Sequence, residues 1–155
     1  FGGGALGGVY KLVEIDGEPK LKVTGDISKT TLPGRKKLIR IVEPGGGFIQ
    51  DVVCLDNEVI GGGDTVYDPV NPLRHTTLPA DILLAEFRDV VMENGRSTFN
   101  EESLEIMAER CQRELKNLPS GCLRLINPHR YKVSISHSLN SLRGELSERI
   151  EKGVS

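Results

Sequence analysis

The segment at residues 5–14 reads ALGGVYKLVE and leads directly into the dipeptide Asp16-Gly17 and a short alternating run at 20–23. Aromatic and β-branched residues after a glycine pair favour a strand over a helix, and successive side chains of a strand point to opposite faces. Asp-Gly often connects two antiparallel strands because its residues accept positive φ angles. The segment therefore predicts a β-hairpin with strands at 9–13 and 20–23.

Turn-forming residues punctuate the whole chain. Eighteen glycines and eight prolines occur among 155 residues, and glycine triplets recur at 2–4, 45–47 and 61–63. Both residue types favour turns. A chain of this length with 37% hydrophobic residues forms one domain or a piece of a larger one. The triplets allow three interpretations: natural turns, engineered linkers, or seams where longer loops are missing.

The charge balance narrows the classes of partner. The formal net charge is −2 and the isoelectric point is about 6.0, which argues against nucleic acids and anionic membranes as partners. No apolar run approaches the length of a membrane span, and no signal peptide precedes the first strand. The three cysteines are odd in number and lack zinc-site spacing. We expect reduced thiols in a cytoplasmic protein. The possibility that a leader peptide was removed before Phe1 stays open.

Two further regions of the first half carry strand patterns. The runs at 38–42 and 48–55 predict a strand pair across a turn at 44–47. Residues 61–72 are expected to be irregular because aspartate, asparagine and proline there favour turns.

The segment at 83–92 is ambiguous between two structures. Its apolar residues fit a helical stripe loosely, but Asn94-Gly95 is a strong hairpin signal. We therefore expect a strand at 83–92 that returns through 96–99.

Residues 101–118 form the clearest predicted helix. Asn100 is placed to cap its start, and Pro119 ends it. One face is apolar and is expected to lie in the core, and it carries Leu104, Met107, Ala108, Cys111 and Leu115.

The chain ends in a strand and a helix. The strand is predicted at 131–135 and the helix at 138–152. The helix is amphipathic, and its predicted buried side is marked by Ile135, Leu139, Leu142, Leu146 and Ile150. Mostly antiparallel strands followed by helices predict an α+β fold. We divide the chain into a β-rich segment at 1–76 that completes a sheet and an α+β segment at 77–155.

Residues that carry chemistry are few. His75, His129 and His137 are scattered and belong to no recognisable catalytic motif, so surface or capping roles are favoured. Asp64 and Asp68 share a loop but lack the other ligands of a calcium site, so we predict no metal site. No catalytic residue is assigned.

A basic segment offers the best candidate for ligand binding. Arg35 and Lys36, followed by another lysine, are predicted to bind phosphate through their charge and through backbone amides of the turn. The alternative is a solvated loop, and the residues alone favour it.

Three stretches together resemble the C-terminal third of nicotinate phosphoribosyltransferases. They are ALGGVYKL at 5–12, KTTLPGRKK at 29–37 and RLINPHRYKVSIS at 124–136, and their order and spacing match that family. The resemblance runs from Phe1 almost to the end of the chain, and it implies that the chain is the C-terminal part of a larger α/β-barrel phosphoribosyltransferase.

The resemblance implies a role in NAD salvage. The family joins nicotinate to phosphoribosyl diphosphate, releases pyrophosphate and forms nicotinate mononucleotide with coupled ATP hydrolysis. It therefore implies Mg²⁺ and ATP as cofactors, nicotinate and phosphoribosyl diphosphate as substrates, and a cytoplasmic homodimer. The first and third stretches are closer to these acid-using enzymes than to the related amide-using enzyme.

The resemblance also implies what the chain lacks. Family members are well over twice as long, and their phosphorylated histidine lies in a barrel that would precede Phe1. A family turn, Phe-Gly-x-Gly-Thr, helps to hold phosphate, and Gly2 and Gly4 match it although Ala5 replaces the threonine. We expect the chain alone to be inactive. The alternative is a non-enzymatic α+β module that docks on a larger partner.

Overall fold

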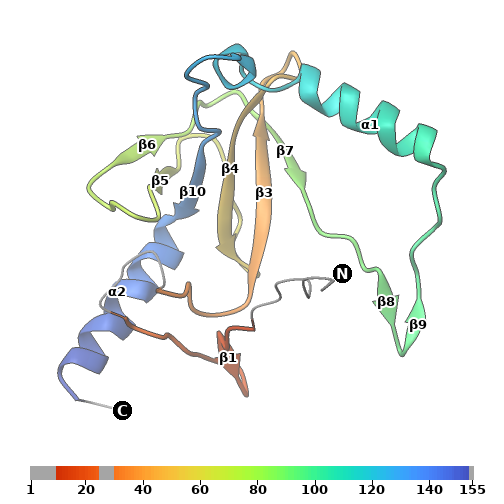
Figure 1. The fold of residues 1–155 in the computed structure, drawn as a ribbon. Helices are drawn as coiled ribbons and strands as arrows, with labels where there is room; N and C mark the ends of the chain where they lie inside the picture. Colours follow the sequence, from red (N-terminus) through yellow and green to blue (C-terminus); the bar gives the residue numbers. More distant parts are fainter. Residues whose placement is uncertain (1–9, 25–29, 154–155) are drawn as a thin grey trace, which may run out of the picture. The chain divides into compact units, whose positions relative to one another are not determined.

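The computed structural model describes residues 10–24 and 30–153 (Figure 1). The chain divides into two compact units, residues 1–35 with 141–155, and residues 36–140. The sequence-based boundary at 76 falls inside the strand β6 (His75–Thr77), and that division stays a prediction.

The unit at 36–140 is built on a six-stranded mixed sheet. The strands lie in the order β6-β5-β10-β4-β3-β7. Neighbours are antiparallel except for β10 and β4, which are parallel because the chain crosses over between them. In chain order the strands are β3 (Lys36–Val42), β4 (Phe48–Leu55), β5 (Thr65–Tyr67), β6, β7 (Leu83–Glu86) and β10 (Val133–Ser136). With its helices the protein has an α+β fold, as the sequence predicts.

The core lies at the centre of this sheet. β4 has a neighbour on each side, and five of its eight residues are buried. The main apolar cluster joins β3, β4 and β5 to the loops beside them through Ile39, Ile41, Val52, Cys54, Ile60, Val66 and Leu78. Alternating apolar side chains on neighbouring strands thus meet on one face of the sheet.

The strands at 38–42 and 48–55 are confirmed, but the prediction for 61–72 is wrong. β5 lies in that segment and pairs with both β6 and β10. β5 has only three residues, which is too short for an alternating pattern to stand out among the turn-forming residues around it. Its extended conformation is determined by cross-strand pairing.

The predicted strand at 83–92 is broken. β7 ends at Glu86, and β8 (Met92–Glu93) pairs with β9 (Arg96–Ser97) in a separate two-stranded sheet. The predicted turn is confirmed, because Asn94 and Gly95 have φ angles of 50° and 76°.

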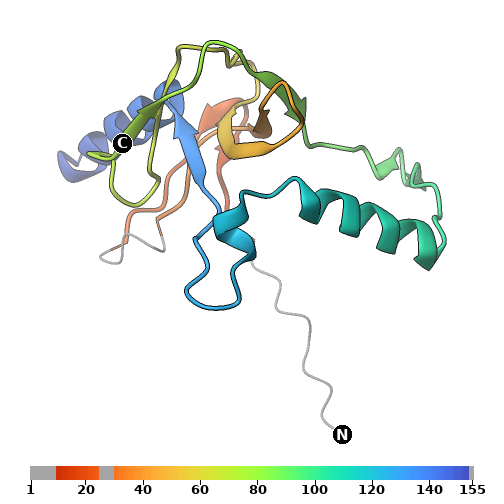
Figure 2. The ribbon, with the colours of Figure 1, turned by 90° about the horizontal axis from the view of Figure 1, so that it is seen from above.

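The helix α1 (Leu104–Lys116) starts later than predicted. Its N-cap is Ser103, whose Oγ accepts a hydrogen bond from the Ile106 amide at 3.4 Å, so the predicted cap Asn100 is wrong. Its predicted core face is also wrong, because no residue of α1 is buried. Figures 1 and 2 show α1 and the β8–β9 hairpin extending away from the six-stranded sheet. We call residues 87–116 the arm. A short 3₁₀ helix (Ser120–Leu123) follows it.

The helix α2 (His137–Glu151) follows β10 without a loop. The Oγ of Ser136 accepts a hydrogen bond from the Leu139 amide at 3.2 Å, which satisfies an amide of the first turn. Leu139 is buried as predicted and is the only fully buried residue of α2. Leu142 and Leu146 are partly buried, and the predicted burial of Ile150 is wrong, because it is 47% exposed.

The unit at 1–35 and 141–155 contains a small hairpin. β1 (Glu14–Ile15) pairs with β2 (Glu18–Pro19) across Asp16 and Gly17, whose φ angles are 50° and 80°. The predicted turn is therefore confirmed. Residues 10–13 and 20–23 are not strands, and Val9 lies outside the described residues. No helix within the described ranges is long and apolar enough to cross a membrane.

Candidate functional site

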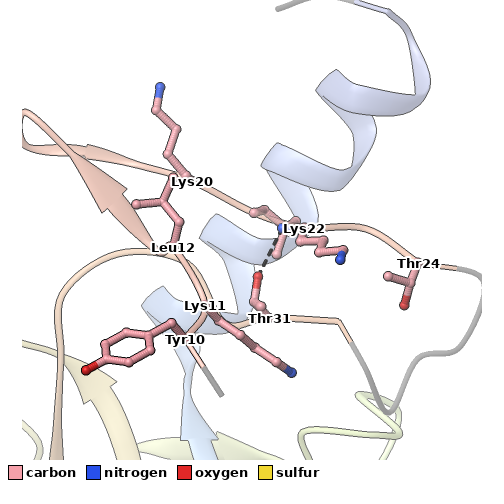
Figure 3. A pocket seen from close by; sticks show the side chains of 8 residues that line it. Tyr10, Lys11, Leu12, Lys20, Lys22, Thr24 and Thr31 are labelled. Atoms are coloured by element: carbon pink, nitrogen blue, oxygen red, sulfur yellow. Dashed lines mark hydrogen bonds between the residues drawn. The ribbon is translucent and has the colours of Figure 1, made fainter. Parts of the chain in front are cut away.

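A cavity of about 410 Å³ lies in the unit formed by residues 1–35 and 141–155 (Figure 3). Its walls come from the segments that flank the hairpin and from Thr31. The lining residues are Tyr10, Lys11, Leu12, Lys20, Leu21, Lys22, Thr24 and Thr31. We call it the lysine cavity.

Backbone hydrogen bonds fix the walls of the lysine cavity. The Val13 carbonyl accepts from the amides of Lys20 at 2.8 Å and Gly34 at 2.7 Å. Thr31 and Lys22 bond to each other twice: the Thr31 amide donates to the Lys22 carbonyl at 3.4 Å, and the Lys22 amide donates to the Thr31 Oγ1 at 3.0 Å. Thr31 is only 4% exposed, and the Lys22 amide satisfies its buried hydroxyl. These reciprocal bonds hold the two segments together.

Three ammonium groups give the lysine cavity a positive charge. Lys20 forms an ion pair with Glu18 at 2.7 Å, and this hydrogen bond lowers the pKa of Glu18. Lys11 and Lys22 form no ion pair with any described residue. Figure 3 shows both side chains extending toward one side of the cavity, away from Lys20. Two unpaired cations beside a threonine hydroxyl suit a phosphate group.

The predicted phosphate-binding residues lie elsewhere. The Arg35 amide and guanidinium donate to the two carboxylate oxygens of Glu14, at 3.1 Å and 3.4 Å. Lys36 is the first residue of β3 and pairs with Leu55. Neither lines the lysine cavity. Gly2 and Gly4 lie outside the described residues, so phosphate binding by all four residues stays a prediction.

Sequence reasoning missed the lysines of the cavity. Lys11, Lys20 and Lys22 lie on the two sides of the predicted Asp16-Gly17 turn, and a hairpin places such residues near one another. Their positions on the two sides of the turn could have indicated a cluster of positive charges. The denser basic run that begins at Arg35 is a stronger pattern in the sequence, but Glu14 engages its first member.

A second polar cluster surrounds Arg40 in the unit at 36–140. The Arg40 Nε donates to Asp51 Oδ1 at 2.8 Å, and its Nη2 donates to Oδ2 at 3.0 Å. Its guanidinium lies 4.3 Å from the Phe48 ring centroid and 4.2 Å from that of Phe87. The Nη1 also approaches Glu114 of α1 at 3.4 Å. Arg40 therefore anchors both ends of the arm.

The electrostatics of this cluster favour a structural role. The Asp51 hydrogen bond raises the pKa of Arg40, so the guanidinium stays charged. The Tyr131 hydroxyl donates to Asp51 Oδ1 at 3.0 Å, and burial raises the pKa of this phenol. The polar groups are thus engaged with one another rather than with a cavity.

The histidines make no catalytic arrangement in the described part of the chain. The imidazole centroids of His75 and His137 lie 5.9 Å and 5.8 Å from the Tyr67 ring centroid, and the Tyr67 hydroxyl is 3.2 Å from His137 Nδ1. The His129 amide donates to the Gly121 carbonyl at 2.8 Å. Among the described residues no group of three histidine, cysteine or acidic side chains is placed to hold a metal ion.

The known proteins that are similar to this chain point to one enzyme family. Residues 35–143 match the family model of the nicotinate phosphoribosyltransferase C-terminal domain. A nicotinate phosphoribosyltransferase of Dictyostelium discoideum is 31% identical over 144 residues, which cover 87% of this chain and 24% of that protein. The human enzyme is 31% identical over 145 residues, which cover 92% and 27%.

A solved structure supports the same relationship. The crystal structure of human nicotinic acid phosphoribosyltransferase matches with a TM-score of 0.68 and 29% identity, covering 92% of this chain and 27% of that one. The chain therefore spans about a quarter of the length of the curated relatives that it matches. It belongs to the nicotinate phosphoribosyltransferase family and corresponds to the C-terminal domain of those enzymes.

Proposed function

We propose that this chain is part of an enzyme that forms nicotinate mononucleotide and pyrophosphate from nicotinate and phosphoribosyl diphosphate, with coupled ATP hydrolysis. The observation that carries the proposal is the family-model match over residues 35–143. The proposal includes Mg²⁺ beside the phosphates and a cytoplasmic homodimer, both implied by the family resemblance.

The lysine cavity gives the chain a role in that reaction. Its walls combine two of the family-like stretches, because Lys11 comes from the first and Thr31 from the second. Displacement of pyrophosphate needs fixed cations that stabilise the charge on the leaving group. We assign to Lys11 and Lys22 the binding of phosphate oxygens of phosphoribosyl diphosphate or of the released pyrophosphate.

The proposal is tested by comparing the isolated 155-residue chain with a full-length enzyme that contains it, called here the longer protein. Turnover is measured with nicotinate, phosphoribosyl diphosphate, ATP and Mg²⁺, with circular dichroism as the control for folding. We expect turnover by the longer protein and none by the 155-residue chain, which carries no recognised catalytic group. Turnover by the isolated chain, or none by the longer protein, contradicts the proposal.

A second candidate function is a non-enzymatic module that docks on a larger partner. The observation that favours it is the exposed apolar face of α1, where Leu104 is 79% exposed and Leu115 is 46% exposed. The same assay separates the two functions, because a module gives no turnover in the longer protein. Stable binding of that protein to a separate partner, with burial of Leu104, would then support the module.

A further inference from the structure

A second cavity, of about 290 Å³, lies on the outer strands of the six-stranded sheet. Val66 of β5 pairs with Thr76 of β6 and with Ser136 of β10, so these three residues share one face of the sheet. Alternation along each chain then brings Asp68, Arg74 and Lys132 to the same face. The full lining is Val66, Asp68, Arg74, His75, Thr76, Lys132, Val133 and Ser134. We call it the sheet cavity.

Two cations, Arg74 and Lys132, line the sheet cavity. Arg74 and Lys132 are exposed and form no ion pair within the described ranges. The Lys132 Nζ donates to the Thr76 Oγ1 at 2.5 Å. Because that hydroxyl accepts from Lys132, its own proton is directed to another acceptor. An ammonium, a guanidinium and a hydroxyl donor thus converge on one cavity.

Asp68 adds a carboxylate to the wall of the sheet cavity. Its Oδ1 accepts from the amides of Val70 at 2.8 Å and Asn71 at 2.9 Å, and these bonds lower the pKa of Asp68. The carboxylate is therefore ionised at neutral pH. It repels a bare anion and accepts hydrogen bonds from hydroxyl groups, so it favours a ligand that carries both an anionic group and hydroxyls.

We propose that the sheet cavity binds a small phosphate monoester that also carries hydroxyl groups. Arg74, Lys132 and Thr76 hold the phosphate oxygens, and Asp68 accepts a hydrogen bond from a ligand hydroxyl. The volume of about 290 Å³ lies just below the range for pockets that bind drug-sized ligands, so it suits only a small ligand. The assignment does not depend on the lysine cavity, which lies in the other compact unit.

Glycerol 3-phosphate is a suitable probe, with inorganic phosphate as the comparison. His75 lines the sheet cavity, so its imidazole resonance in histidine-labelled protein reports local binding. The resonance is assigned by its loss in His75→Gln. We expect a saturable shift with glycerol 3-phosphate and weaker binding of inorganic phosphate, which lacks the hydroxyls.

Charge-removing variants test the assigned residues. Arg74→Met and Lys132→Met are each expected to raise the dissociation constant about tenfold, because each removes a charge-assisted contact. Arg96→Met is the matched control, because it removes one exposed positive charge from the β8–β9 hairpin. Unchanged thermal melting shows that each variant is folded. No saturable shift, or equal affinities in Arg74→Met and Arg96→Met, overturns the proposal.

Discussion

The centre of the six-stranded sheet and the arm both carry apolar patterns in the sequence, but their burial is opposite. Ile41 and Val52 are completely buried, whereas Leu104 of the arm is 79% exposed. Arg40 connects the two regions, since it contacts Phe87 at one end of the arm and Glu114 at the other. An apolar stripe therefore predicts that a face is hydrophobic without predicting what covers it.

The largest expected difference is in the free energy of unfolding. Ile41→Ala removes a fully buried side chain and is expected to cost about 2–5 kcal/mol, because it leaves a cavity. Leu104→Ala in the arm is expected to change stability by less than about 0.5 kcal/mol. Urea unfolding of both variants measures the difference. Equal losses would show that the arm is as tightly packed as the sheet.

Breaking the connection between the two regions is expected to cause the next largest loss of stability. Arg40→Met leaves the 9%-exposed carboxylate of Asp51 without its ion pair and is expected to cost about 2–4 kcal/mol. Amide hydrogen exchange in residues 87–116 should accelerate as well. Arg88→Met is the control, because Arg88 is 49% exposed and pairs at the surface, where such pairs contribute little. Equal stability losses in the two variants would contradict the anchoring role of Arg40.

A substitution at a close backbone approach beside the core should cause a smaller loss of stability. A Cβ at Gly62 would lie 2.4 Å from the Ala80 carbonyl oxygen, so Gly62→Ala is expected to cost about 1–3 kcal/mol. A Cβ at Gly61 meets nothing within 4 Å, which makes Gly61→Ala the matched control. Thermal unfolding of the two variants measures the difference, and equal stabilities would contradict the close approach.

The smallest expected effect concerns pH. Burial raises the pKa of Cys54 from an ordinary value of 9.0 to about 11. Between these values the unfolded thiol loses a proton that the folded thiol keeps, so the free energy of unfolding falls as pH rises from about 9 to about 11. We expect Cys54 to account for about 1–2 kcal/mol of this fall. Urea unfolding across this range should show a steeper fall than in Cys54→Ala; parallel profiles would contradict it.

The sequence predicted the parts of the fold that local rules determine. The Asp16-Gly17 and Asn94-Gly95 turns and the strands at 38–42 and 48–55 are present because turn chemistry and alternation act within a few residues. β5 was missed, because only pairing with β6 and β10 makes those three residues a strand. The burial of α1 was wrongly predicted for a similar reason, since packing partners determine burial.

The candidate site was less predictable than the fold. The sequence singled out Arg35 and Lys36 as candidates for phosphate binding because adjacent basic residues form a visible run, although the residues alone favoured a solvated loop. The lysine cavity instead uses Lys11 and Lys22, which are brought near each other by the hairpin and by the reciprocal hydrogen bonds of Thr31. The charge of the Arg35 segment is partly offset by Glu14, a long-range pairing that the sequence pattern does not reveal.

The most direct test of the proposed function is the KM for phosphoribosyl diphosphate in the longer protein. Lys11→Met with Lys22→Met removes two ammonium groups of the lysine cavity that form no ion pair with a described residue. Lys152→Met, which removes an exposed lysine paired with Glu148, is the control. We expect the double variant to raise this KM about tenfold or more, with little change in the KM for nicotinate. An unchanged KM for phosphoribosyl diphosphate would contradict phosphate binding in the lysine cavity.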